Sequence, residues 1–186
     1  MPSWARIATR SRVPLGFVFA AAYLWFARPQ WIWIAAGCVF VIAGLAIRGA
    51  AAGHIRKNRE LTTTGPYAYT RNPLYLGSIL IAIGFVLAAH NLWIALAAVV
   101  MFVAIYLPVI RAEETYLRSA FAGYDEYMER VPRLLPRLTP FKSGEAGQDR
   151  AAYSPELYWR HREYNAILGA VLMMGALIAK VLLVQH

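Results

Sequence analysis

Long apolar runs alternate with short polar segments along this chain. Hydrophobic residues make up 59% of it and charged residues only 16%, and an apolar run of about 20 residues is long enough to cross a bilayer as a helix. We therefore predict an all-α membrane bundle of about five transmembrane helices with additional interfacial helices, formed by a single domain over residues 1–186. The expected spans cover approximately residues 11–27, 31–53, 73–89, 92–110 and 164–184.

The first apolar run has a second interpretation. It contains Pro14, and Arg6, Arg10 and Arg12 lie before or at its start, as in the basic region of a cleaved signal peptide. The segment after it, Ala27-Arg28-Pro29-Gln30, fits a cleavage site poorly, and another apolar run follows at once. These two features favour a retained span.

Basic residues gather on one side of the predicted spans. Of the nineteen Lys and Arg residues, seventeen fall on the side of the N-terminus, and only Arg28 and Lys180 fall on the other. The positive-inside rule then predicts a cytosolic N-terminus and a C-terminus on the opposite side. The formal net charge of +9 indicates contact with anionic lipid headgroups. We expect no nucleic-acid partner, because the sequence shows no nucleic-acid-binding motif.

Two polar segments interrupt the apolar pattern at the predicted cytosolic face. The first polar segment, residues 60–77, reads ELTTTGPYAYTRNPLYLG, and its Gly-Pro and Asn-Pro pairs are turn or helix-start signals. The second polar segment, residues 111–114, reads RAEE and follows the fourth apolar run. Because both are placed at the same face, we predict that they form one site.

The region from residue 111 to residue 163 is the largest polar part of the chain. We predict a helix over 111–130 that continues from the fourth span along the membrane interface and ends at Val131-Pro132. An extended strap, a Gly-rich linker over 142–150 and a new helix should follow. Ser154 is a suitable N-cap for that helix, and Pro155 suits its first position.

Several common kinds of site are not indicated. The sequence contains no G-x-G-x-x-G after a strand, no P-loop and no G-x-S-x-G elbow. Cys38 is the one cysteine and lies inside an apolar run, and no two of the four histidines are spaced i, i+4. We therefore predict no metal site and no intramolecular disulfide.

The two polar segments together carry a resemblance to a known family. The order is Gly65-Pro-Tyr, then Arg71-Asn-Pro-Leu-Tyr-Leu-Gly77, two spans, Glu113-Glu114, Phe121-Ala-Gly-Tyr124 with Tyr127, and Arg130-Val-Pro132. This order resembles the isoprenylcysteine carboxyl methyltransferases, a family that overlaps with bacterial phospholipid methyltransferases of the same membrane fold. The resemblance covers roughly residues 48–136.

The resemblance implies an S-adenosylmethionine-dependent methyltransferase embedded in the bilayer. The cofactor would enter from the cytosolic side and a lipid-like acceptor laterally from the membrane. It also implies an integral protein of a bacterial inner membrane, with the active site facing the cytosol. The chain departs from the eukaryotic members in two ways. Asn72 stands where they have histidine, and an extra span over 164–184 either reshapes the acceptor entrance or mediates oligomerisation.

The residue types suit this cofactor. Tyrosine rings offer a wall for adenine or a face for the sulfonium. A helix beginning at Pro73 would present the amides of residues 74–77 to the cofactor carboxylate, and Arg71 could pair with the same group. Glutamates can hold the ammonium or the ribose, and Gly77 permits close approach. The predicted cofactor-binding residues are His54, Gly65, Tyr67, Arg71, Asn72, Pro73, Tyr75, Leu76, Gly77, Glu113 and Glu114; Glu114 and Arg130 are the predicted catalytic residues.

Each of these residue types has an alternative role. Arg71 could anchor a span end at lipid phosphates, the tyrosines could form an interfacial belt, and the two glutamates could be solvated charges. Arg130 and Arg133 suit an acceptor carboxylate or phosphate and suit lipid anchoring equally well. An acidic pair against the membrane on a cationic face favours function.

The acceptor stays open at this point. A prenylcysteine carboxylate would require an arginine, and a phospholipid amine would require a base; a thiol or a small hydrophobic carboxylate is a further option. Two other function classes are compatible with the pattern. One is a non-catalytic lipid-binding or assembly protein. The other is a membrane reductase of the sterol-reductase type, for which 186 residues leave little room to bind a nicotinamide dinucleotide.

Overall fold

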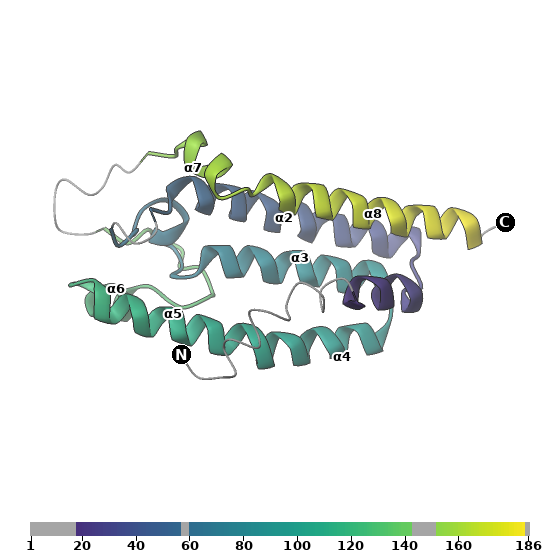
Figure 1. Cartoon of the computed structure of the whole chain (residues 1–186), viewed down its shortest axis with the longest axis horizontal. Coiled ribbons are helices and arrows are strands. Elements are labelled where there is room, and N and C mark those ends of the chain that lie inside the picture. Colours follow the sequence, from purple (N-terminus) through teal and green to yellow (C-terminus); the bar gives the residue numbers. More distant parts are fainter. Residues whose placement is uncertain (1–17, 57–59, 143–151, 185–186) are drawn as a thin grey trace.

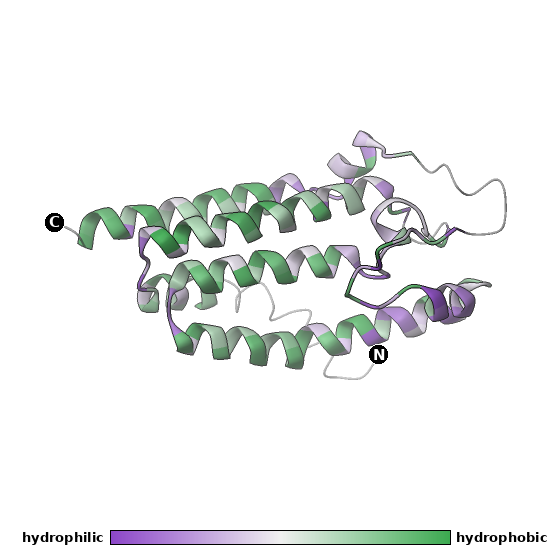
Figure 2. Ribbon diagram, turned by 180° about the vertical axis from the view of Figure 1, so that it is seen from behind, coloured by the Kyte–Doolittle hydropathy of each residue, from purple (hydrophilic) through white to green (hydrophobic). Residues whose placement is uncertain are grey.

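Long helices lie side by side, and most of the hydrophilic residues lie at one end of the molecule (Figures 1 and 2). The computed structural model describes residues 18–56, 60–142 and 152–184, and within these it contains helices and no strands. The prediction of an all-α fold is confirmed. Besides a helical stretch over 18–26, the elements are α2 (Trp31–His54), η1 (Gly65–Ala68), α3 (Pro73–Ala89), α4 (Leu92–Met101), η2 (Phe102–Tyr106), α5 (Leu107–Ala120), α6 (Tyr124–Arg130), α7 (Pro155–Arg160) and α8 (Tyr164–Val184).

Among the residues that the structure describes, three helices are long and apolar enough to cross a membrane. They are α2, the continuous helix Leu92–Ala120 and α8. α3 is equally apolar, but its 17 residues lie at the short end of the range for a span. The beginning of the first predicted span lies outside the described residues, so the count of five spans stays a prediction.

Glycines on facing sides hold α2 and α3 close together. A Cβ added at Gly44 would lie 2.5 Å from the carbonyl oxygen of Gly77, and one added at Gly84 would lie 2.5 Å from that of Gly37. Side chains at these positions would separate the helices, whereas glycine lets the two backbones touch, as small residues commonly do in membrane bundles. The contact brings the end of α2 against the beginning of α3.

The helix that begins at Leu92 changes its winding near its middle. Residues Phe102–Tyr106 form a π-helical turn, and the Leu107 N–H donates to the Phe102 carbonyl. Pro108 follows at once, and it has no N–H with which to continue the regular ladder. The helix nevertheless continues to Ala120. The polar residues after Ile110 therefore extend the apolar part of the helix without a break.

The prediction of one helix over 111–130 is wrong. α5 ends at Ala120, Phe121 is extended, and α6 begins only at Tyr124. Gly123 adopts φ 86°, a conformation that other residues rarely take. This turn redirects the chain, so that α6 and the strap after it return toward the first polar segment.

The strap and α7 follow the predicted pattern. Residues 131–142 contain no helix, and their amides reach back to the first polar segment: Arg137 donates to the Tyr69 carbonyl at 3.0 Å and Phe141 to the Ala68 carbonyl at 2.9 Å. Ser154 is confirmed as the N-cap of α7, accepting from the Leu157 amide, with Pro155 at the first position.

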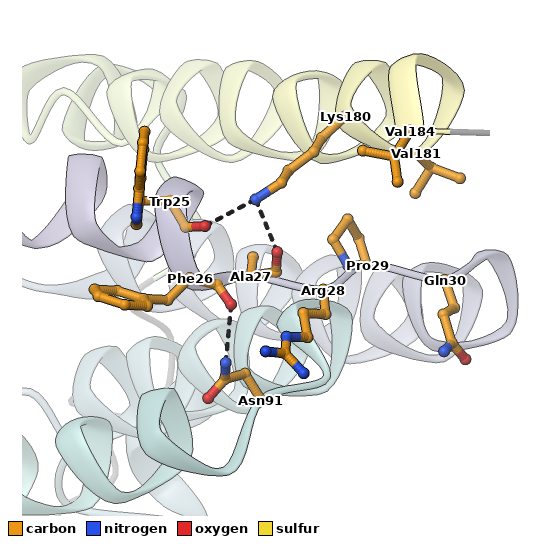
Figure 3. Close-up of a pocket in the computed structure, with 10 residues that line it drawn as sticks. All are labelled: Trp25, Phe26, Ala27, Arg28, Pro29, Gln30, Asn91, Lys180, Val181 and Val184. Atoms are coloured by element: carbon orange, nitrogen blue, oxygen red, sulfur yellow. Dashed lines mark hydrogen bonds between the residues drawn. The ribbon is translucent and has the colours of Figure 1, made fainter. Parts of the chain in front are cut away.

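Lys180 closes the opposite end of the bundle, although it lies in an apolar helix. Its ammonium donates to the Leu24 carbonyl at 2.6 Å. Figure 3 shows the other three bonds, from Lys180 to the carbonyls of Trp25 and Ala27 at 3.0 and 2.8 Å and from the Asn91 amide to the Phe26 carbonyl at 2.8 Å. These carbonyls lie in the last turn of the helical stretch 18–26 or just after it, where no intrahelical donor remains for them. Lys180 therefore serves as a cap at the wall of a cavity of about 580 Å³.

Candidate active site

The two polar segments meet at the end where α3 begins. The Tyr75 hydroxyl donates to Glu113 Oε2 at 3.0 Å, and the Asn72 side-chain amide donates to Glu114 Oε1 at 3.2 Å. Each pair joins the start of α3 to α5, about forty residues further along the chain. The predicted meeting of the two segments is thus found.

Glu114 is the centre of a buried charged cluster. Its side chain is 8% exposed and accepts from Arg133, with Nη2 2.7 Å from Oε2 and Nε about equally near both oxygens. Arg71 Nη1 lies 3.5 Å from Oε1, and the Asn72 amide contacts the same oxygen. One carboxylate therefore faces two guanidinium groups and an amide. The hydrogen bond that Arg133 donates to Glu114 raises the pKa of Arg133.

The strap brings Arg133 to this cluster. The Arg71 amide donates to the Pro132 carbonyl at 2.9 Å, and both Thr70 Oγ1 and the Asn72 side chain donate to the Arg133 carbonyl at 3.1 Å. These bonds fix the strap over residues 70–72. Arg133 was considered only as a contact for an acceptor or for lipid, and its pairing with Glu114 was not predicted. The one sequence signal for that pairing is the stop at Val131-Pro132, which lets the chain turn back.

Arg71 is buried and only loosely held: its Nη1 pairs with Glu114 at 3.5 Å, and its guanidinium also interacts with the Tyr124 hydroxyl. Its side chain is 9% exposed, and neither Nε nor Nη1 makes a hydrogen bond within the described part of the chain. Buried donors without a partner are uncommon in folded proteins. A planar guanidinium with donors to spare suits a carboxylate ligand, which it can bind bidentately.

The Tyr67 hydroxyl is a second buried group with no hydrogen-bond partner among the described residues. The backbone at Tyr67 is fixed in place, because the Tyr127 hydroxyl donates to the Tyr67 carbonyl at 2.7 Å. Burial raises the pKa of Tyr67, and the nearby Tyr127, Glu113 and Glu163 raise it further. Tyr67 therefore keeps its proton and offers a neutral donor.

The start of α3 offers fewer amides than predicted. Pro73 occupies its first turn, as expected, but the Leu76 amide already donates to the Asn72 carbonyl at 2.9 Å. The predicted set of free amides over residues 74–77 is thus too large. Gly77 faces α2, where an added Cβ would lie 2.5 Å from Arg48 Cγ. What approaches this glycine closely in the structure is α2.

His54, at the end of α2, packs against the first polar segment at Gly65. Its Nδ1 lies 2.8 Å from the Ala50 carbonyl, and its ring packs against Gly65, which adopts φ 58°. A Cβ at Gly65 would lie 2.5 Å from the histidine ring. The absence of a side chain at Gly65 therefore lets the turn close over His54.

Arg130 is not brought to the cluster. Its side chain is 60% exposed and pairs with Glu126, one turn earlier on α6, at 3.2 Å. The Glu126–Arg130 pair lies on a solvent-facing side of α6, so a direct role for Arg130 in the site stays a prediction.

Comparison with known proteins now bears on this geometry. The family model described as phospholipid methyltransferase matches residues 31–123, half of the chain. The chain belongs to this family. The match runs from the start of α2 to the turn after α5, and so contains both polar segments and the Glu114 carboxylate. Arg133 and α8 lie beyond it.

Individual relatives share about a third of their residues with the chain over the aligned part. The chain is 30% identical to a cobalt-zinc-cadmium resistance protein, CzcN, of Cupriavidus metallidurans over 70% of its own length and 64% of that protein. It is 32% identical to a nickel-cobalt-cadmium resistance protein, NccN, of Alcaligenes xylosoxydans xylosoxydans over 61% and 58%, respectively. It is also 32% identical to the protein-S-isoprenylcysteine O-methyltransferase of Schizosaccharomyces pombe, over 53% and 42%. The chain thus spans less than two thirds of each relative. No solved structure matches it.

Proposed function

We propose that this phospholipid methyltransferase family member uses S-adenosylmethionine to methylate a lipid-like acceptor at the cytosolic face of a bacterial inner membrane. The acceptor is the amine of a phospholipid or the carboxylate of a prenylcysteine-like compound. The family description supports the first, and the name of the yeast relative supports the second.

The observation that carries this proposal is that Arg71 and Tyr67 are among the buried groups that lack a hydrogen-bond partner within the described part of the chain. Arg71 Nε and Nη1 and the Tyr67 hydroxyl are all buried donors, and they come from the same polar segment. S-adenosylmethionine has a carboxylate for Arg71 and hydroxyl and ring acceptors for Tyr67. The donor set therefore fits the cofactor, which when bound supplies a methyl group activated by its positive sulfur.

Glu113 is better placed than Glu114 to receive the cofactor ammonium. Glu114 is already shared by Arg133, Arg71 and Asn72, whereas Glu113 is half-buried and accepts from Tyr75. We therefore assign Glu114 to holding the arginines and Glu113 to contacting the ligand. Most of the catalysis would then come from positioning the two reactants, since methyl transfer requires an aligned displacement.

The test is product formation. Purified protein is incubated with methyl-labelled S-adenosylmethionine and total membrane lipid, and the labelled product is identified. We expect a labelled lipid or hydrophobic carboxylate with the wild-type protein and a strongly reduced yield with Arg71→Ala. Arg118→Ala is the matched control, because Arg118 is 60% exposed and pairs with Asp125. Equal label from wild type and Arg71→Ala would place the site elsewhere.

A further inference from the structure

The C-terminal part of the chain is attached to the polar end of α2 at four places. The Ser154 amide donates to the Gly53 carbonyl at 2.9 Å, and the Tyr153 ring packs on His54 with centroids 5.9 Å apart. Tyr158 lies against Gly49. The fourth contact is an ion pair between Arg48 and Glu163. All of these attachments come from residues beyond the family match, which ends at residue 123.

The Arg48–Glu163 pair is bidentate and largely buried. Arg48 Nε donates to Glu163 Oε2 at 3.0 Å and Nη2 to Oε1 at 2.8 Å, and the two side chains are 23% and 10% exposed. Burying two charges between helices costs desolvation energy, so a pair of apolar side chains at these positions would hold the helices together at least equally strongly. Holding α8 in place is therefore not a sufficient reason for this pair.

The remaining nitrogen of Arg48 is directed at α3. Nη1 donates to Ser78 Oγ and to the Leu74 carbonyl, the latter at 3.3 Å. Leu74 stands between Pro73 and Tyr75, in the turn that carries the site. The aliphatic part of Arg48 crosses Gly77, where a Cβ would collide with it. A chain of contacts thus runs from Glu163, in the turn just before α8, through Arg48 to the first two turns of α3.

We propose that Glu163, supplied by the C-terminal part of the chain outside the family match, is a positioning residue of the methyl-transfer site. Its carboxylate orients Arg48, and Arg48 fixes the turn of α3 that presents Asn72 to Glu114 and Tyr75 to Glu113. This inference rests on the proposed function for the reaction it serves. The contact chain on which it depends can be tested without cofactor or acceptor.

The structural readout is hydrogen exchange of the protein without ligands. Glu163→Gln keeps the size of the side chain and removes its charge, so Arg48 loses its bidentate partner. We expect faster amide exchange over residues 74–78, with little change in α4 and α5. Glu156→Gln is the matched control, because Glu156 is an exposed carboxylate on the neighbouring α7. If Glu163→Gln does not fold, Ser78→Ala tests the same chain of contacts from the α3 side and should give the same local effect.

The functional readout separates positioning from simple attachment of α8. Misplacing a reactive group by a fraction of its contact distance lowers kcat by roughly ten- to a hundredfold, so Glu163→Gln should lower kcat while the acceptor KM changes little. Glu163→Asp should recover part of the rate. Unchanged exchange over 74–78 together with a wild-type kcat would overturn the inference. If the wild-type protein bound no S-adenosylmethionine but the exchange effect were present, the proposed function would fail while the contact chain stood.

Discussion

Glu114→Gln is the substitution that best separates a cluster-holding role from a direct cofactor contact. The glutamine keeps the shape of the side chain and one acceptor oxygen. In the wild-type protein the carboxylate accepts hydrogen bonds from Arg133 and Asn72 and pairs with Arg71. The substitution replaces the other oxygen with an NH₂ group, which is itself a donor and would face these donors. The two arginines would lose their shared negative charge.

The size of the effect follows from burial. A hydrogen bond to a charged, buried partner contributes about 1.5–3 kcal/mol, and this applies to the bond that the buried Asn72 amide donates to Glu114. Arg133 is 41% exposed, so its share is reduced by solvent to about 0–1 kcal/mol. We expect Glu114→Gln to lower the free energy of unfolding by about 1.5–4 kcal/mol.

The assay is denaturant unfolding in detergent micelles, followed by helix content. Glu126→Gln is the control, because Glu126 is 61% exposed in its pair with Arg130 and such surface changes alter stability by about 0.5 kcal/mol or less. A Glu114→Gln protein as stable as this control would refute the account of Glu114 as the residue that holds the arginines. Its principal role would then be ligand binding.

Three further predictions follow from other parts of the structure. Lys180→Met should lower the free energy of unfolding by about 1.5–3 kcal/mol, because three carbonyls lose their donor; the exposed Lys142→Met should not, and equal stability of the two variants would refute the capping role. Arg130→Ala should leave cofactor affinity within about twofold of wild type, since its pair with Glu126 is exposed; a loss as large as that of Arg71→Ala would bring Arg130 back into the site. Reporter fusions after Gln148 and after His186 should report opposite sides of the membrane, and a report from the same side would reject α8 as a crossing helix.

Local signals in the sequence were enough to predict the elements that form the site. Apolar runs of sufficient length predict membrane helices whatever their neighbours are, and the Asn72-Pro73 pair marks the start of α3 because proline suits a first helical turn. The meeting of the two polar segments followed from placing span ends at one face. That argument needs only lengths and charges.

The partners inside the site could not be predicted in the same way. Arg48 and Glu163 are 115 residues apart, and hydropathy does not tell which sides of two apolar helices face each other. Arg133 reaches Glu114 because a positive-φ glycine at 123 turns the chain and the strap then pairs with residues 68–71. Gly77 was predicted to give the cofactor close access. Its contact with α2 could not be foreseen, because that contact depends on which side of α3 faces α2.

Binding of the cofactor to purified protein tests the central claim most directly. Isothermal titration in detergent with S-adenosylmethionine and S-adenosylhomocysteine should show saturable binding by the wild-type protein and by Arg118→Ala. Loss of a charged hydrogen-bonded contact should weaken binding by Arg71→Ala roughly ten- to over a hundredfold. No binding of either compound by wild-type protein shown to be folded would contradict the account, and undiminished binding by Arg71→Ala would mean that the buried guanidinium serves another ligand.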